Sequence, residues 1–186
     1  MAPGQTDLTE EVLIARAIQG DKESFGSLYE LYLDQIYRYF YYRVGEHGEA
    51  EDLTETAFLK AWERLQVNPE QLTIDNFRAW IYRIAHNLAI DRYRTRKQHL
   101  QLEQAEPLLD PDPAPETVTQ AGQESQRIAR AIAQLEPLLQ EVIVCRFINQ
   151  LSHAETAAII GRNAGHVRVL QYRALKQMRA FLEAGS

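Results

Sequence analysis

The chain has 186 residues, enough for one domain or two small ones, and its hydrophobic fraction of 45% is ordinary for a protein with a packed core. Its single cysteine, Cys145, excludes an intramolecular disulfide and a cysteine-based metal site. The formal net charge of −6 taken alone disfavours binding to nucleic acid.

The charge is unevenly distributed along the chain. Residues 1–75 hold 6 Lys/Arg against 15 Asp/Glu, and residues 98–126 hold none against 6. Residues 76–97, by contrast, hold 6 against 1, and residues 127–186 hold 8 against 4. Two basic blocks separated by acidic ones predict two anion-binding surfaces. The sequence contains neither a signal peptide nor a membrane-length apolar run, so we expect a cytoplasmic protein without membrane insertion.

The first two predicted helices cover residues 10–20 and 22–44. Apolar positions recur at three- and four-residue steps in both, and Gly20 ends the first. The second contains an unusually aromatic run, residues 37–43. We favour a wide core stripe edged by tyrosines for this run. The alternative is that some of its rings, with Arg38 or Arg43, lie near DNA.

A third helix is predicted over residues 49–66. Its buried stripe comprises Leu53, Ala57, Phe58, Ala61, Trp62 and Leu65. A second face, with the spacing i, i+3, i+4, i+7 and i+11, comprises Asp52, Glu55, Thr56, Leu59 and Glu63. From the residues alone, a solvated surface is the favoured interpretation of this acidic face.

Residues 76–97 are the one strongly basic segment and form the next predicted helix. Asn68-Pro69 stops the preceding helix, and Asp75 is a plausible N-cap. The inner stripe comprises Phe77, Ile81, Ile84, Ala85 and Leu88, and another side comprises Trp80, Arg83, Asn87, Ile90, Arg94 and Lys97. Cations, an amide and an indole suit melted DNA. An amphipathic helix with solvated arginines and a core tryptophan fits the composition equally well.

Residues 98–126 are predicted to be an acidic linker. Four prolines forbid a continuous helix, although residues 98–106 are able to prolong the helix before them. Its 29 residues would span about 30 Å as a flexible coil and about 95–100 Å when fully extended. A coil of this kind cannot hold two domains at a fixed spacing.

Helices resume at residues 124–134 and 137–148, with Cys145 as a small core residue. The capping box of Ser152 and Glu155 then opens a short helix, and a turn at residues 161–163 leads to a longer one up to Leu182. This pattern is typical of a helix-turn-helix, and a plain helical hairpin is the alternative. The predicted inner side of the longer helix comprises Val167, Leu170, Ala174, Leu175 and Met178.

Three motifs resemble those of one known family. They occupy residues 50–54 with 58–62, residues 77–85 with 87–92, and residues 135–147 with 151–174. They are similar, respectively, to regions 2.2, 2.3–2.4 and 4 of a bacterial RNA polymerase sigma factor of the extracytoplasmic-function (ECF) group of the sigma-70 family. The resemblance covers roughly residues 11–97 and 124–182.

The resemblance implies an all-α fold of two small helical domains joined by the acidic, proline-containing linker. Residues 1–97 would be sigma region 2, residues 98–126 the linker, and residues 127–186 sigma region 4 with its helix-turn-helix. Such a protein would bind core RNA polymerase, through the beta and beta-prime subunits, and promoter DNA. Members of the group are commonly held inactive by an anti-sigma factor. No cofactor, metal or catalytic residue is implied.

The resemblance also assigns site residues by motif position. The polymerase-binding face would be Asp52, Leu53, Glu55, Thr56 and Leu59. The −10 element would be recognised and opened by Phe77, Arg78, Trp80, Arg83, Asn87, Asp91 and Arg94, with a flipped base held near Asn87. The −35 element would be read in the major groove by Arg162, Asn163, His166, Arg168, Val169, Tyr172 and Arg173.

The chain departs from the family pattern at two places. Glu55-Thr56 stands where Gln then Glu is usual, and Val169-Leu170 replaces a common Ser-Arg pair. The second departure removes two polar contacts, so the residues predict no −35 sequence.

Two rival functions remain. The first is a helix-turn-helix regulator that acts without joining polymerase, which leaves the two N-terminal motifs unexplained. The second is a metal-dependent nuclease, which needs clustered carboxylates or histidines. The five histidines are scattered without ligand spacing.

Overall fold

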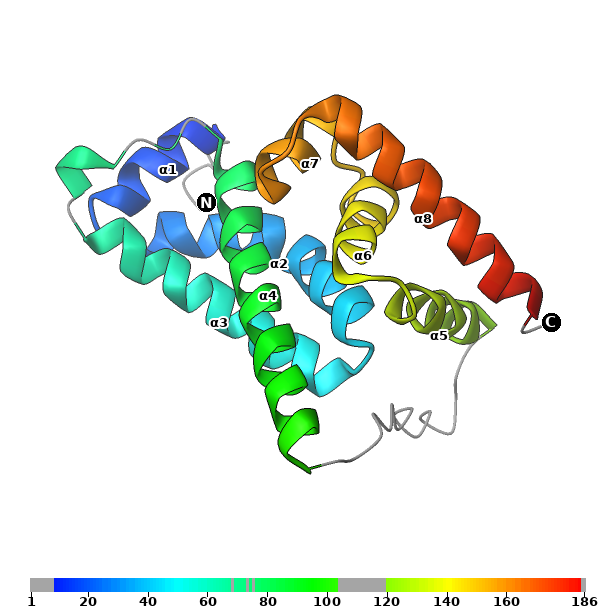
Figure 1. Cartoon of the computed structure of the whole chain (residues 1–186). Coiled ribbons are helices and arrows are strands. Elements are labelled where there is room, and N and C mark those ends of the chain that lie inside the picture. Colours follow the sequence, from blue (N-terminus) through cyan, green and yellow to red (C-terminus); the bar gives the residue numbers. More distant parts are fainter. Residues whose placement is uncertain (1–8, 68, 73, 75, 104–119, 185–186) are drawn as a thin grey trace.

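The computed structural model describes residues 9–67, 69–72, 74, 76–103 and 120–184. Within these ranges the secondary structure is entirely helical, so the all-α prediction is confirmed (Figure 1). None of the helices among the described residues combines the length and apolarity needed to cross a membrane. The elements are α1 (Glu10–Ile18), α2 (Lys22–Val44), α3 (His47–Gln66), the 3-10 turn η1 (Pro69–Gln71), α4 (Phe77–Glu103), α5 (Gln120–Ala133), α6 (Pro137–Ile143), the π turn η2 (Val144–Ile148), α7 (His153–Ile160) and α8 (Ala164–Ala184).

Helices α1–α4 form an N-terminal helical unit. Asp21 caps α2 by accepting a hydrogen bond from the Glu23 backbone N–H at 3.1 Å. Gly45, with φ of 78°, ends that helix, and the Glu46 carboxylate caps α3. The apolar stripes of these helices meet in a common core that contains Leu28, Ile36, Phe40, Ala57, Leu65, Phe77, Ile81 and Ile84.

The helix predicted from residue 76 is confirmed as α4, and it is longer than the basic segment. The Asn76 side chain accepts a hydrogen bond from the Ala79 backbone N–H at 2.9 Å, so Asn76 supplies a cap at this end. Asp75, the predicted cap, lies outside the described residues. Residues 98–103 continue α4, and α5 begins at Gln120 rather than at residue 124. The middle of the predicted linker, residues 104–119, lies outside the described residues.

Helices α5–α8 form a C-terminal helical unit. Both hydrogen bonds of the capping box of Ser152 and Glu155 are present at the start of α7, and Gly161, with φ of 66°, ends this helix. Val167, Leu170, Ala174 and Met178 of α8 are buried as predicted. Leu175 does not face inward, because its side chain is 42% exposed. One helical residue turns through about 100°, so Leu175 points away from its buried neighbour at 174.

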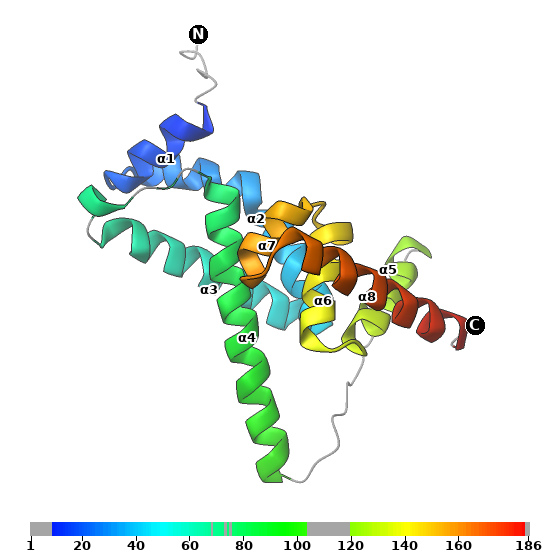
Figure 2. The ribbon, with the colours of Figure 1, turned by 45° about the horizontal axis from the view of Figure 1, so that its top comes forward.

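The two helical units pack directly against each other. Helix α2 contacts α5 and the π turn, and α4 contacts α7 (Figures 1 and 2). In both views α4 stands upright, with α1 to its left and α6–α8 to its right. The relative position of the two units is therefore fixed by side-chain contacts, whereas the linker alone predicted two tethered bodies without a set spacing.

Candidate nucleic-acid interface

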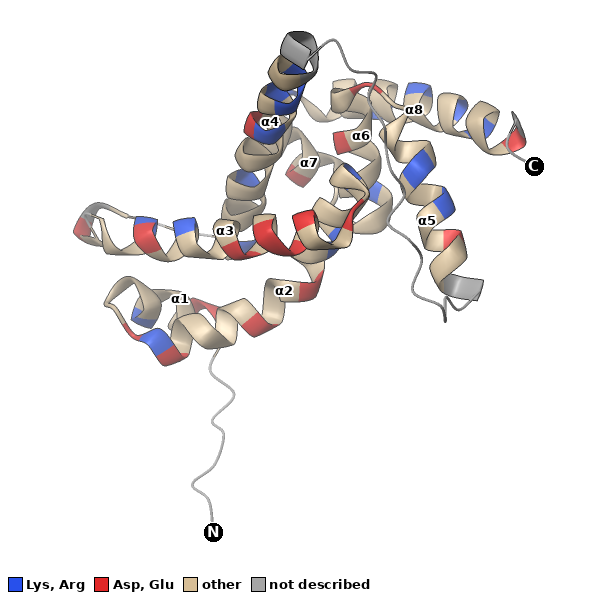
Figure 3. Ribbon diagram, turned by 90° about the horizontal axis from the view of Figure 1, so that it is seen from below, with Lys and Arg blue, Asp and Glu red and all other residues tan. Residues whose placement is uncertain are grey.

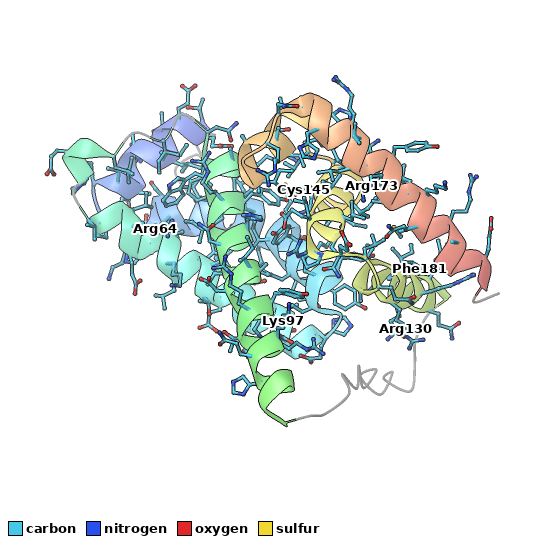
Figure 4. All side chains as sticks on the ribbon, in the orientation of Figure 1. Arg64, Lys97, Arg130, Cys145, Arg173 and Phe181 are labelled. Atoms are coloured by element: carbon cyan, nitrogen blue, oxygen red, sulfur yellow. The ribbon has the colours of Figure 1, made fainter. Side chains whose placement is uncertain are left out.

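Helix α4 exposes a polar, basic side. Arg83, Asn87, Asp91 and Arg94 are all exposed to solvent, and Lys97, labelled in Figure 4, follows them along the same helix. These residues lie at steps of three and four, so they share one side of the helix. Cations and an amide that were predicted to recognise the −10 element therefore face solvent together on one helix.

Two aromatic residues begin this side of α4 and differ in burial. Phe77 is fully buried, so its ring packs in the core of the N-terminal unit. Trp80 is half-buried, and its ring centroid lies 5.6 Å from that of Phe77. The Trp80 indole therefore packs against Phe77 and stays partly exposed, whereas Phe77 is not part of the exposed side of α4.

Arg78 is held by the C-terminal unit. Its guanidinium donates a hydrogen bond to the backbone carbonyl of Asn149 at 2.9 Å. It also forms an ion pair with Glu155, with Nη1 and Oε1 3.5 Å apart. Glu155 is itself the third helical residue of α7, and its side chain accepts a hydrogen bond from the backbone N–H of the N-cap, Ser152. One member of the predicted −10 set thus contacts protein in this structure.

The predicted polymerase-binding face of α3 is acidic and exposed. Asp52 and Glu55 face solvent, and Leu59 between acidic neighbours is 56% exposed. Thr56 is half-buried, and its hydroxyl donates to the Asp52 carbonyl at 2.8 Å. Figure 3 shows acidic residues repeating along α3, opposite in charge to the basic residues on α4. An exposed leucine between carboxylates provides both apolar and charged contacts for a protein partner.

Helix α8 carries the second predicted DNA-reading surface on its outer side. Tyr172 is 71% exposed, and Arg173, labelled in Figure 4, is exposed on the same helix. Asn163 has a structural role, because its side-chain oxygen accepts a hydrogen bond from the His166 backbone N–H at 2.8 Å and so caps α8. The remaining predicted −35 residues are also exposed: Arg162, His166, Arg168 and Val169.

A buried ionic cluster joins the two units, and the sequence did not predict it. Arg43 Nη1 lies 2.6 Å from Glu141 Oε2, and their side chains are 5% and 1% exposed. The Tyr39 hydroxyl donates to Glu141 Oε1 at 2.8 Å, and His86 Nδ1 lies 3.0 Å from Oε2. We call Tyr39, Arg43, His86 and Glu141 the Glu141 cluster. Its sequence signals were a cation inside an aromatic run and a lone carboxylate inside the apolar segment 137–148.

The Glu141 cluster pairs a buried carboxylate with a buried cation, and burial and charge together shift the pKa values of its members. Burial would raise the pKa of the Glu141 carboxyl, but the charge of Arg43 and the neighbouring His86 and Tyr39 outweigh this and lower it to about 2. Burial, with the Glu141 charge second, raises the pKa of the Tyr39 phenol well above its usual value. Burial likewise raises the pKa of the Cys145 thiol, whose sulfur lies 3.4 Å from Glu141 Oε1. Glu141 is therefore charged, and Tyr39 and Cys145 are neutral, at neutral pH.

Known sequence families match both units. The Sigma-70 region 2 family matches residues 28–99, and the Sigma-70 region 4 family matches residues 125–178. Together they define the chain as a sigma-70-type factor with a region 2 unit and a region 4 unit.

Individual relatives identify the group within the sigma-70 family to which the chain belongs. The ECF RNA polymerase sigma factor BldN of Streptomyces coelicolor is 37% identical over 173 residues, covering 91% of this chain and 64% of BldN. The ECF RNA polymerase sigma factor SigW of Bacillus subtilis is 30% identical over 184 residues, covering 91% of this chain and 96% of SigW. The solved structure of CnrH in complex with the cytosolic domain of CnrY has a TM-score of 0.71 at 26% identity, covering 95% of this chain and 99% of CnrH. The chain belongs to the ECF RNA polymerase sigma factors, as its motifs predicted.

Family membership decides between the two DNA-binding interpretations. A sigma factor is a transcription initiation factor that acts with RNA polymerase. A helix-turn-helix regulator acting alone would account for the region 4 match but not for the region 2 match over residues 28–99. The sigma-factor function is therefore favoured over this alternative.

Proposed function

We propose that residues 1–97, which include α1–α3 and most of α4, capture the melted −10 element. We propose that residues 127–186, which include part of α5 and all of α6–α8, read the −35 element. The observation that carries this division of work is the pair of exposed basic helix faces, one on α4 and one on α8. Each is presented by a rigid helix, and each coincides with a matched sigma-70 region.

The chemistry of the α4 face suits single-stranded DNA. Arg83 and Arg94 can neutralise phosphates, and the half-buried indole of Trp80 offers a face on which an unpaired base can stack. Asn87 supplies an amide that can bond a base edge. Opening a duplex costs unstacking free energy, and capture of the freed base offsets part of it.

The chemistry of the α8 face suits duplex DNA. An α-helix fits the major groove, and the first turns of a recognition helix contact base edges. His166 and Arg173 are exposed on this side and reach outward, whereas Asn163 holds the helix start. Arg162 and Arg168 would contact phosphates and set the register.

The acidic face of α3 is the proposed contact with core polymerase. Asp52, Glu55 and Leu59 combine exposed charge with exposed apolar surface. We further propose that the protein acts in the cytoplasm, as a non-catalytic initiation factor, and that an anti-sigma factor restrains it. The sigma factor CnrH, which is similar to this chain, was solved in complex with the cytosolic domain of another protein, CnrY, so a sigma factor of this fold can bind a further protein partner.

Run-off transcription with sigma-free core polymerase tests this function. Addition of the chain should produce initiation at defined sites, which sequencing of transcripts from genomic DNA would identify. The chain without core should bind promoter DNA weakly. Tight, sequence-specific binding by the free chain, or no initiation with core, would contradict the proposal.

A further inference from the structure

We propose that the Glu141 cluster and the contacts of Asn149 form a polar latch that closes the C-terminal unit onto the N-terminal unit and competes with promoter binding. The competition, though not the closure itself, rests on the proposed function of α4. The latch also explains the aromatic run 37–43, which the DNA-binding surfaces leave without a role.

The first anchor of the latch is the Glu141 cluster. Glu141 belongs to α6, whereas Tyr39 and Arg43 belong to α2 and His86 to α4. Arg43 also donates to the Pro137 carbonyl at 3.2 Å, at the start of α6. One carboxylate of the C-terminal unit is therefore held by three side chains from two helices of the N-terminal unit.

The second anchor is Asn149, which follows the π turn. Its side-chain amide donates to the Gln35 carbonyl at 2.7 Å and to the Tyr82 hydroxyl. Its backbone carbonyl accepts the hydrogen bond from Arg78. Asn149 is 4% exposed, so these bonds form away from water. All three partners again come from α2 and α4.

The latch is sensitive to the loss of either half of the ion pair. Arg43 and Glu141 are buried together, and each neutralises the other. If one is removed, the other remains as an uncompensated buried charge while the units stay closed, but it is hydrated once they separate. Loss of one partner therefore drives opening. Replacement of both by apolar residues of similar size removes this penalty and favours closure again.

Closure and promoter binding use the same residue. Arg78 lies at the start of α4, two residues before Trp80, and in the closed state its guanidinium is bonded to Asn149 and paired with Glu155. A DNA strand on this end of α4 must displace those contacts. The two units must also move apart before α4 and α8 can reach two separate promoter elements, which are more than one helical turn of DNA apart, a turn being about 35 Å.

The single cysteine provides a built-in probe of closure. Cys145 is fully buried beside Glu141, at the level of the π turn against α2 (Figure 4). In the closed full-length chain its thiol is shielded from an aromatic disulfide reagent. Opening of the latch exposes this side of the π turn and accelerates modification. Small-angle X-ray scattering of the same samples gives the radius of gyration as a second measure.

The test compares E141Q, R43M, N149A and the double variant R43M/E141M in the full-length chain. E141Q and R43M should react at Cys145 about a hundredfold faster than the parent, and with a larger radius of gyration, because a broken buried pair shifts an equilibrium by at least this factor. N149A should change both measures in the same direction by a smaller factor of about ten, because it removes neutral hydrogen bonds only. R43M/E141M should return toward the parent on both measures. R38Q and E136Q, which change exposed residues of α2 and of the α6 cap, are matched controls without effect.

Circular dichroism separates opening from unfolding. Single variants that open keep the helical signal of the parent, and N149A tests the latch without burying an unpaired charge. Parent-like Cys145 reactivity and parent-like radius of gyration in E141Q, R43M and N149A would overturn the latch. So would a double variant that is more open than either single variant.

The functional arm titrates the chain against a fixed amount of core polymerase on one promoter. Opened variants should reach half-maximal open complex at about tenfold lower concentration, since closure of the two units no longer opposes assembly. An unchanged requirement in variants shown to be open would overturn the competition. If the parent chain fails to initiate with core at all, the proposed function fails, while the closure measurements still decide the latch.

Discussion

Helices α4 and α8 are both long and basic on one side, and each carries a proposed DNA-binding surface. They differ in how far other parts of the protein pack against that surface. Helix α8 packs on α5, α6 and α7 of its own unit, with Val167, Leu170, Ala174 and Met178 buried, and the side with Tyr172 and Arg173 faces solvent. Helix α4 packs on α2, α3 and, through Arg78, on the loop and helix around α7.

The two surfaces are therefore exposed to different degrees. The proposed DNA-binding side of α8 is exposed as it stands, whereas Arg78 at the start of α4 is held by Asn149 and Glu155 of the C-terminal unit. Anything that weakens the contact between the units should therefore act mainly on the function of α4.

The largest effect is expected from the Arg43–Glu141 pair. R43M should lower the free energy of unfolding by about 3–5 kcal/mol, because the variant either keeps Glu141 buried without its counter-charge or opens and loses the contacts between the units. Urea denaturation followed by circular dichroism measures this loss, with R38Q as the control on the same helix. A loss below about 1 kcal/mol, typical of exposed pairs, would mean that the pair is solvated.

The pH dependence of stability should carry the signature of Glu141. Its folded pKa of about 2 is below the ordinary value of 4.5, so its contribution is fully present above pH 4.5 and is lost as the pH falls through 2. The difference between parent and E141Q should shrink by about 3 kcal/mol over this window. Acid titrations of both proteins by denaturant midpoint measure it. A constant difference would show that Glu141 titrates normally.

Trp80 tests base stacking on α4. W80A should weaken open-complex formation by about 1–3 kcal/mol, the value of one stacked base, with binding to core polymerase unchanged. Permanganate footprinting of the melted strand reports opening. W80F keeps an aromatic face and should recover most of the activity. Loss of helical signal in W80A would instead assign Trp80 to the core beside Phe77.

The smallest effect is expected on α8. R168A should weaken promoter binding by the holoenzyme several-fold and reduce the salt slope by about one, as removal of one phosphate contact does. R179A, an exposed arginine further along α8, is the control. Filter binding at several salt concentrations measures both slopes. Equal effects of the two variants would remove Arg168 from the proposed interface.

Local features of this fold were predictable from the sequence. The capping box of Ser152 and Glu155, the glycine that ends α7 and the inner stripe of α4 all act within a few residues, so their chemistry can be read from spacing. The acidic face of α3 and the exposed basic side of α4 follow from helical periodicity in the same way.

The contact between the units was not predictable in this way. Arg43 and Glu141 lie 98 residues apart in the chain, and their pairing depends on how two finished units dock. The aromatic run was correctly interpreted as mainly core, since Tyr39, Phe40 and Tyr41 are buried. Nothing local in the run indicates that its core continues into the second unit. The same holds for Arg78, which shares a motif with DNA-contacting positions but contacts Asn149 here.

The π turn after α6 has a consequence for how insertions and deletions would be tolerated. Its backbone bond from Asn149 N–H to the Val144 carbonyl, 3.0 Å, encloses one residue more than an α-helical turn does. Deleting one residue between 144 and 148 would restore α-helical winding and swing everything after it through about 100°. Asn149 would then point away from Gln35 and Tyr82. The number of residues in this one turn therefore determines whether the C-terminal unit packs on the N-terminal unit.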